Sequence, residues 1–130
     1  FTLASGGMHA TLRDVGRVGL LMANYGQVGN EQVVPEAWLR AVFEDPGERP
    51  WPSASEAGEQ RYYKNFVWGI GDGRGSVQAR GVHGQTIYVD PTAEMVLVRL
   101  ASFPTAKNGK IDPTSLPAYQ AVANYLMRLE

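Results

Sequence analysis

The stretch from Arg80 to Leu100, RGVHGQTIYVDPTAEMVLVRL, combines strand-forming residues with a small cluster that could do chemistry. His83, Gly84 and Gln85 stand directly before the strand-like run that starts at Thr86. Glycine weakens a strand interior, so Gly84 indicates a bulge or a close approach of another group to the backbone. From the pattern alone, a histidine in a turn at a strand end is the better interpretation.

Several standard catalytic sites are excluded by residue type and spacing. Two histidines, His9 and His83, without cysteine do not favour a zinc site. The glycines at 69, 71, 73 and 75 do not fit Gly-x-Gly-x-x-Gly and indicate a hairpin rather than a nucleotide loop. No serine lies in Gly-x-Ser-x-Gly or precedes a lysine by three residues, so this chain lacks a recognisable activated nucleophile. We expect no metal and no cofactor.

The Tyr63-Lys64-Asn65 triplet imitates a Tyr-x-Asn catalytic motif. Its neighbours Phe66, Val67 and Trp68 place it at the start of an aromatic, β-branched run typical of a strand. We therefore interpret the triplet as part of a strand and not as a catalytic group.

Length and composition favour one ordinary globular domain. The chain has 130 residues, 44% of them hydrophobic and 19% charged, which suffices for a hydrophobic core. The net charge of −1, without a block of like charges, recommends neither a nucleic-acid nor an anionic-membrane partner. No apolar run is long enough to predict a membrane span, and no cysteine selects a compartment. The periplasm and the cytoplasm both remain open.

Helical periodicity appears in three places. Thr11 and Asp14 form a capping pair before a helix in which Val15, Val18 and Met22 recur, and Gly26 is a natural stop. A second helix begins at Pro35 and is predicted to bury three residues, Trp38, Leu39 and Val42. The last helix is predicted to bury one face, made of Leu116, Tyr119, Val122, Ala123 and Leu126.

Between the second and last helices the chain indicates a long loop followed by three or four strands. Residues 45–60 are rich in Pro, Gly, Ser and Glu and are predicted to form the loop. Strands are predicted over 62–73, up to Val82, over 86–89 and over 95–101, with glycine-rich or Asp-Pro turns between them. This order predicts an α+β fold with an antiparallel β-meander and flanking helices.

Two sequence blocks carry a family resemblance. SGGMHATLRDVGRVGLLMANYGQVGNEQVVPEAW, followed by GVHGQTIYVDPTAEMVLVRLASFP, resembles the C-terminal part of the serine β-lactamase-related hydrolases. That family includes class C β-lactamases, penicillin-binding carboxypeptidases, esterases and 6-aminohexanoate-dimer hydrolases, and the last group carries a similar His-Gly-Gln before YVDP. The resemblance implies a β-lactamase/transpeptidase-like fold, with residues 1–130 as a single C-terminal fragment of the domain.

The resemblance also implies roles for the opening cluster. His83-Gly84-Gln85 takes the place of the family's third motif, Lys-Thr-Gly or a variant. Gly84 and Gln85 would border the substrate, although the Gln85 amide could instead satisfy local backbone. The Thr86 N–H would be one oxyanion-hole donor, fixed before charge develops. His83 would supply a polar or partly cationic group beside an amide or ester substrate.

The family's Ser-x-x-Lys and Tyr-x-Asn motifs are missing in the expected context, and the chain begins at Phe1. We expect a longer parent whose serine forms an acyl-enzyme, and expect this chain alone to be inactive. The alternative is a non-enzymatic truncated homologue that serves binding or assembly. The family sheet has five strands with 95–101 inside, so the isolated chain should expose that strand as an apolar edge. Its partner would be the missing N-terminal portion or a second copy.

Overall fold

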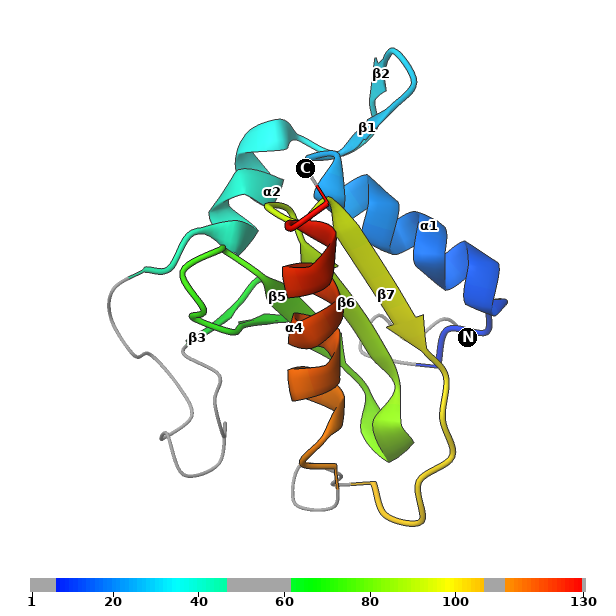
Figure 1. Ribbon diagram of the computed structural model, residues 1–130. Coiled ribbons are helices and arrows are strands. Elements are labelled where there is room, and N and C mark those ends of the chain that lie inside the picture. The colour runs from blue at the N-terminus through cyan, green and yellow to red at the C-terminus, as the bar shows by residue number, and fades with distance from the viewer. Residues whose placement is uncertain (1–6, 47–61, 107–111, 130) are drawn as a thin grey trace.

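The computed structural model describes residues 7–46, 62–106 and 112–129 (Figure 1). Helix α1 spans Leu12–Ala23, and the Thr11 side chain accepts a hydrogen bond from the Asp14 N–H, which confirms the predicted cap. Helix α2 spans Glu36–Phe43 directly after Pro35, as predicted. The predicted loop over 45–60 lies mostly outside the described residues.

The second helix buries only part of the predicted face. Leu39 and Val42 are 2% and 0% exposed, whereas Trp38 is 45% exposed and its predicted burial is wrong. Between α1 and α2 a small hairpin, β1 (Gln27–Val28) and β2 (Glu31–Gln32), extends from the body of the molecule (Figure 1). This hairpin was not predicted, because its two strands are too short to show a period of two.

The main sheet has five antiparallel strands, one or two more than the sequence indicates. They are paired in chain order, β3-β4-β5-β6-β7. Their bounds are β3 Tyr62–Lys64, β4 Val67–Gly69, β5 Val77–Arg80, β6 Thr86–Asp90 and β7 Met95–Arg99. Every connection joins neighbouring strands, so the predicted α+β meander is confirmed.

The extra strand arises from a tight turn inside the segment predicted as one strand. Asn65 and Phe66 both have positive φ, +49° and +67°, and together they reverse the chain between β3 and β4. Positive φ at both central residues is the geometry of two-residue hairpin loops that match the twist of the strands. Asparagine adopts this region readily, but the aromatic Phe66 gave no sequence signal for a turn.

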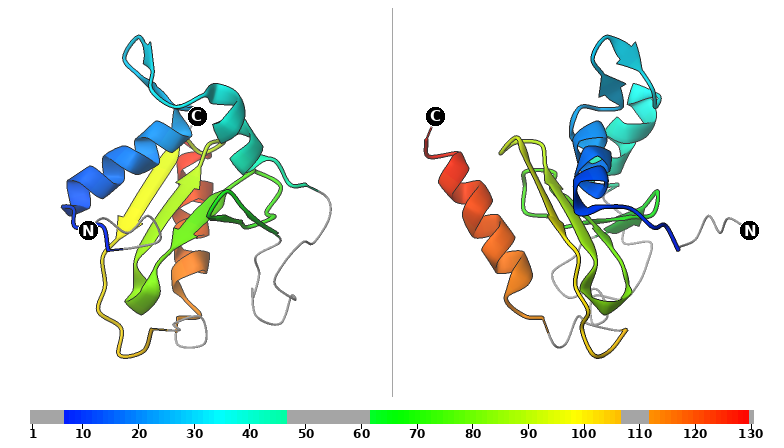
Figure 2. Two further views of the ribbon diagram at one scale, coloured as in Figure 1. Left: turned by 180° about the vertical axis from the view of Figure 1, so that it is seen from behind. Right: turned by 90° about the vertical axis from the view of Figure 1, so that its right-hand side faces the viewer.

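Helices cover both faces of the sheet (Figure 2). On one face, buried residues of α2 and of strands β4 to β6 form a core that includes Leu39, Val42 and Val77. On the same face α1 packs on β6 and β7, and a Cβ added to Gly19 would overlap a Val96 methyl carbon. Glycine therefore lets the helix approach the strand closely.

The opposite face carries the last helix, α4, which spans Ser115–Leu126. Tyr119 and Ala123 are buried against Tyr88 and Met95, as the helical spacing predicts. Val122 and Leu126 are 45% and 36% exposed, so their predicted burial is wrong for this chain. Among the described residues, the helices are too short and too polar to cross a bilayer.

Candidate active-site wall around His83

The His83-Gly84-Gln85 cluster lies at the end of the sheet where β5 stops and β6 begins. A short 3-10 turn over Val82–Gly84 connects the two strands. His83 is exposed and has a left-handed backbone conformation, with φ +57° and ψ 22°. Histidine adopts this region more readily than most residues, but a single left-handed residue still needs contacts that hold it.

The segment after β7 supplies those contacts. The Phe103 N–H donates to the His83 carbonyl at 3.0 Å, and the His83 N–H donates to the Ala106 carbonyl at 3.3 Å. The His83 ring nitrogen Nδ1 lies 2.7 Å from the Phe103 carbonyl oxygen. Three hydrogen bonds therefore tie the backbone and the ring of His83 to residues 103–106, about twenty positions further along the chain.

The surroundings of Gly84 show why a glycine stands directly before strand β6. It is buried with φ +91°, and an added Cβ would lie 2.9 Å from the Phe103 ring and 3.1 Å from the Ala101 Cβ. The Arg99 guanidinium lies over the Phe103 ring, 4.9 Å from the ring centroid, and its Nε donates to the Gly84 carbonyl at 3.0 Å. The group that approaches this glycine is an aromatic ring of the protein itself.

The Gln85 side-chain amide forms the pair of hydrogen bonds that a backbone residue of a neighbouring strand would form. Its Nε2 donates to the Ala101 carbonyl at 2.5 Å, and its Oε1 accepts from the Ala101 N–H at 3.1 Å. Both ends of the amide are therefore occupied beyond the end of β7. This is the local role left open by the sequence, and contact of Gln85 with a substrate stays a prediction.

Thr86 opens β6 and is 5% exposed, with Arg80 and Arg99 as its register partners on either side. The Gln85 carbonyl accepts from the Gly81 N–H at 2.9 Å and so faces β5. Because C=O and N–H of a trans peptide point in opposite directions, the Thr86 N–H points toward β7. The oxyanion-hole role of Thr86 stays a prediction, and it requires this N–H to leave the ladder of the sheet.

Two arginines, Arg80 and Arg99, lie beside the His83-Gly84-Gln85 triplet on the face of the sheet that carries α4. Arg99 donates to Asp112 Oδ2 at 2.8 Å, and Arg80 shares its row across the sheet. Burial alone would raise the pKa of Asp112, but hydrogen bonds from Ser115 and Arg99 outweigh it and hold the pKa below its ordinary value. Burial lowers the pKa of Arg80, with Asp112 opposing and Arg99 reinforcing the shift. Two cations thus share one carboxylate here.

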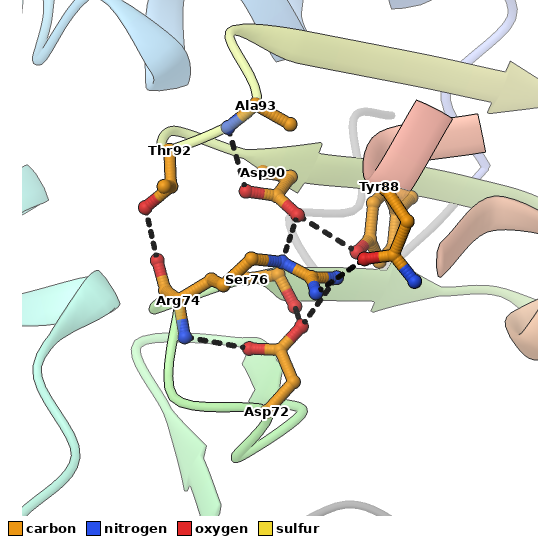
Figure 3. Close-up of polar contacts among 8 residues, drawn as sticks. Asp72, Arg74, Ser76, Tyr88, Asp90, Thr92 and Ala93 are labelled. Carbon is orange, nitrogen blue, oxygen red and sulfur yellow. Dashed lines mark hydrogen bonds and ion pairs between the residues drawn. The ribbon is translucent and has the colours of Figure 1, made fainter. Parts of the chain in front are cut away.

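A buried charged network at the other end of β6 was missed by the sequence analysis (Figure 3). The Arg74 Nε donates to Asp90 Oδ2 at 2.8 Å, and Ser76 donates to Asp72. Asp90 is 0% exposed, and the Tyr88 hydroxyl also donates to its carboxylate at 3.3 Å. The network fixes the glycine-rich 71–75 segment, which the sequence indicates only as a flexible turn, against the turn between β6 and β7.

A hollow in the surface also lies at that end. Its volume is about 280 Å³, and its lining includes Tyr25, Arg40, Phe43 and Arg74. It is therefore separated from His83 by the length of β6. The Tyr63-Lys64-Asn65 triplet lies in β3 and its turn, where Tyr63 packs on Trp68 with ring centroids 4.6 Å apart. The described residues contain no group of three side chains suited to hold a metal.

Two known proteins resemble this chain along most of its length. A 6-aminohexanoate-dimer hydrolase from Paenarthrobacter ureafaciens is 34% identical over 109 residues, which is 80% of this chain and 27% of that protein. A solved structure, provisionally assigned as a 6-aminohexanoate-dimer hydrolase from Bacillus anthracis, is 26% identical over 92% of this chain and 30% of its own, with a TM-score of 0.72.

The predicted resemblance to the β-lactamase-related hydrolases is confirmed. No family model matches the chain. The chain spans less than a third of the length of either relative, which agrees with the expected missing portion. The five-stranded meander and its helices match one part of the larger fold of these 6-aminohexanoate-dimer hydrolases.

Proposed function

We propose that this chain forms one wall of the active site of a serine hydrolase that cleaves amide or ester bonds. The proposal rests on one observation above all, the His83-Gly84-Gln85 triplet held at the end of the sheet by residues 101–106. A catalytic wall needs groups that are in place before the substrate arrives, and three hydrogen bonds on His83 meet that need. The relatives' names add that proteins with this fold include amide hydrolases.

In the proposed mechanism the nucleophile comes from the portion of the parent that this chain lacks. A serine activated there attacks the substrate carbonyl, forms an acyl-enzyme and loses the acyl group to water. Gly84 lets the triplet pack closely on the Phe103 ring. His83 presents its ring to the substrate, and the Thr86 N–H stabilises the oxyanion if β6 shifts to release it. Gln85 holds the triplet to Ala101.

The relatives' names also suggest a substrate class. A 6-aminohexanoate dimer is a linear molecule with one internal amide between flexible methylene chains. We propose that this chain helps to bind substrates of that class. Methylene chains offer the protein no hydrogen-bonding groups beside the amide, so polar groups of the protein must orient the amide itself. His83 is the exposed polar side chain of the triplet.

The test uses a joined protein, in which this chain follows the segment of the Paenarthrobacter relative that it does not match. His83→Ala should lower kcat for an amide substrate roughly tenfold, because it removes one hydrogen bond to the reacting group. His9→Ala, at the chain's other and exposed histidine, is the matched control and should leave kcat unchanged. Unchanged turnover in His83→Ala, together with a lower Tm, would show a purely structural histidine.

A further inference from the structure

The contact between the His83 ring and Phe103 determines where the ring carries its hydrogen. Nδ1 lies 2.7 Å from the Phe103 carbonyl oxygen, and a carbonyl oxygen can only accept. Nδ1 must therefore carry the hydrogen. In the neutral ring Nε2 is then left with a lone pair, and a histidine whose tautomer is fixed in this way presents a single defined acceptor.

The alternative ring orientation is excluded by the same surroundings. Rotating the ring by half a turn would replace Nδ1 by a carbon atom and leave the Phe103 carbonyl without this bond. The Phe103 backbone cannot move away easily, because its N–H donates to the His83 carbonyl and its ring packs against Gly84. Arg99 donates to the Gly84 carbonyl, and its guanidinium also packs over the Phe103 ring. Residue 103 is thus a positioning residue for His83.

Nε2 of His83 has no hydrogen-bond partner among the described residues, and the side chain is exposed. We infer that His83 accepts a hydrogen bond through Nε2 from an N–H group of the substrate, and that it thereby favours amides over matching esters. This inference rests on the proposed function. Of the polar or partly cationic roles that the family resemblance implies, it selects the polar one, because a neutral acceptor recognises a donor and not a negative charge.

The first test measures the tautomer without any substrate. Long-range ¹H–¹⁵N spectra of the chain are recorded at alkaline pH, where an imidazole carries one hydrogen. His83 should show a protonated Nδ1 and an unprotonated Nε2. His9 is an internal control in the same sample, since it is exposed and should show the mixture typical of a free side chain, in which the other tautomer dominates.

His9→Gln and His83→Gln each remove one set of signals and so assign the spectra. If His83→Gln fails to fold, His9→Gln alone identifies the remaining histidine. Equal tautomer mixtures at both positions would contradict the inference. Because no nucleophile or substrate is involved, this result does not depend on whether the proposed function is right.

The second test compares an amide with its matched ester in the joined protein. His83→Ala should lower kcat/KM for the amide roughly three- to tenfold more than for the ester, the usual effect of one neutral hydrogen bond. An equal loss for both substrates would overturn the acceptor role while leaving the proposed hydrolase intact. If the wild-type joined protein cleaves neither substrate, the proposed function itself fails, so the two failures are distinguishable.

Discussion

At the scale of single residues, Gly84 is the position of the candidate site where a side chain is least tolerated. Its φ of +91° and the Phe103 ring 2.9 Å from an added Cβ are two separate obstacles to a side chain. Gly73 shares the first obstacle but not the second, because its φ is +80° and nothing lies within 4 Å of an added Cβ. The pair therefore separates the backbone effect from the steric one.

We expect Gly84→Ala to lower the free energy of unfolding by about 1–3 kcal/mol more than Gly73→Ala does. The left-handed conformation costs roughly 1–2 kcal/mol in either variant. Only Gly84→Ala also crowds a packed ring, and overpacking typically adds about 1–3 kcal/mol. Urea denaturation of both variants measures the difference. Equal losses would mean that Phe103 moves aside without cost and does not hold the triplet.

Asp112 predicts a pH dependence of stability. Its pKa is held below the ordinary 3.8 in the folded chain, so its contribution to stability is complete above about pH 4 and is lost as the pH falls through the folded pKa. Asp112→Asn should cost about 1–2 kcal/mol at pH 7, since it removes the charge that Arg99 pairs with. Denaturation at pH 7 and pH 3 should show that cost shrinking in acid.

The control for that series is Glu31→Gln, which removes a carboxylate from the exposed strand β2. It should change stability little at either pH, as expected for surface substitutions. A cost of Asp112→Asn that stays the same from pH 7 to pH 3 would contradict the charged pairing with Arg99.

At the scale of elements, the hairpin β3–β4 illustrates what could be predicted and what could not. The aromatic run 62–68 indicates strand, and the structure agrees, but the turn at Asn65-Phe66 lies within it. Phe66 is 83% exposed in a left-handed conformation, which is unfavourable for an aromatic residue on both counts. Tertiary pairing of β4 with β5 outweighs that local preference.

Phe66→Gly should therefore stabilise the chain by about 0.5–1 kcal/mol. Relief of the left-handed conformation is worth roughly 1–2 kcal/mol, and the greater freedom of glycine in the unfolded chain cancels part of it. Phe66→Ala is the matched control, because it removes the ring but keeps the unfavourable φ. Thermal melts of the two variants decide the cause. If alanine stabilises as much as glycine, ring exposure and not backbone conformation is responsible.

The candidate site shows the same limit of prediction. The sequence identifies His83, Gly84 and Gln85 because a strand does not normally begin with such residues. It cannot identify their partners, Ala101 and Phe103, since these are brought near only when β7 pairs with β6. The charged network of Asp72, Arg74 and Asp90 could not be predicted from the sequence for the same reason. Contacts between distant segments are set by the register of the sheet.

At the scale of the whole molecule, strand β7 and both long helices present apolar surface. β7 is an outer strand of the sheet, and several large apolar side chains of α1, α4 and the C-terminal end are exposed: Leu12, Leu20, Val122, Tyr125 and Leu129. An open edge beside apolar faces is a template for pairing with another chain. We therefore expect the isolated chain to fold by self-association rather than as a monomer.

Size-exclusion chromatography with light scattering tests this expectation. The variant Val98→Pro tests whether the association occurs through the free edge of β7. Since Thr86 points its N–H toward Arg99, the backbone N–H of the next residue along, Val98, points out from the free edge. Proline there removes an outward donor without breaking the β6–β7 ladder, so it should reduce association. A wild-type monomer with a sharp cooperative melt would show a self-sufficient domain and favour the non-enzymatic alternative.

Covalent labelling by a fluorophosphonate, read by intact mass, tests whether this chain completes a serine hydrolase whose nucleophile lies elsewhere. We predict no adduct on the 130-residue chain, because none of its serines precedes a lysine by three residues. We predict a single adduct on the joined protein, located outside this chain. An adduct on the chain alone would show a nucleophile within these 130 residues. A joined protein that folds and stays unlabelled would contradict the claim that the chain completes a serine hydrolase.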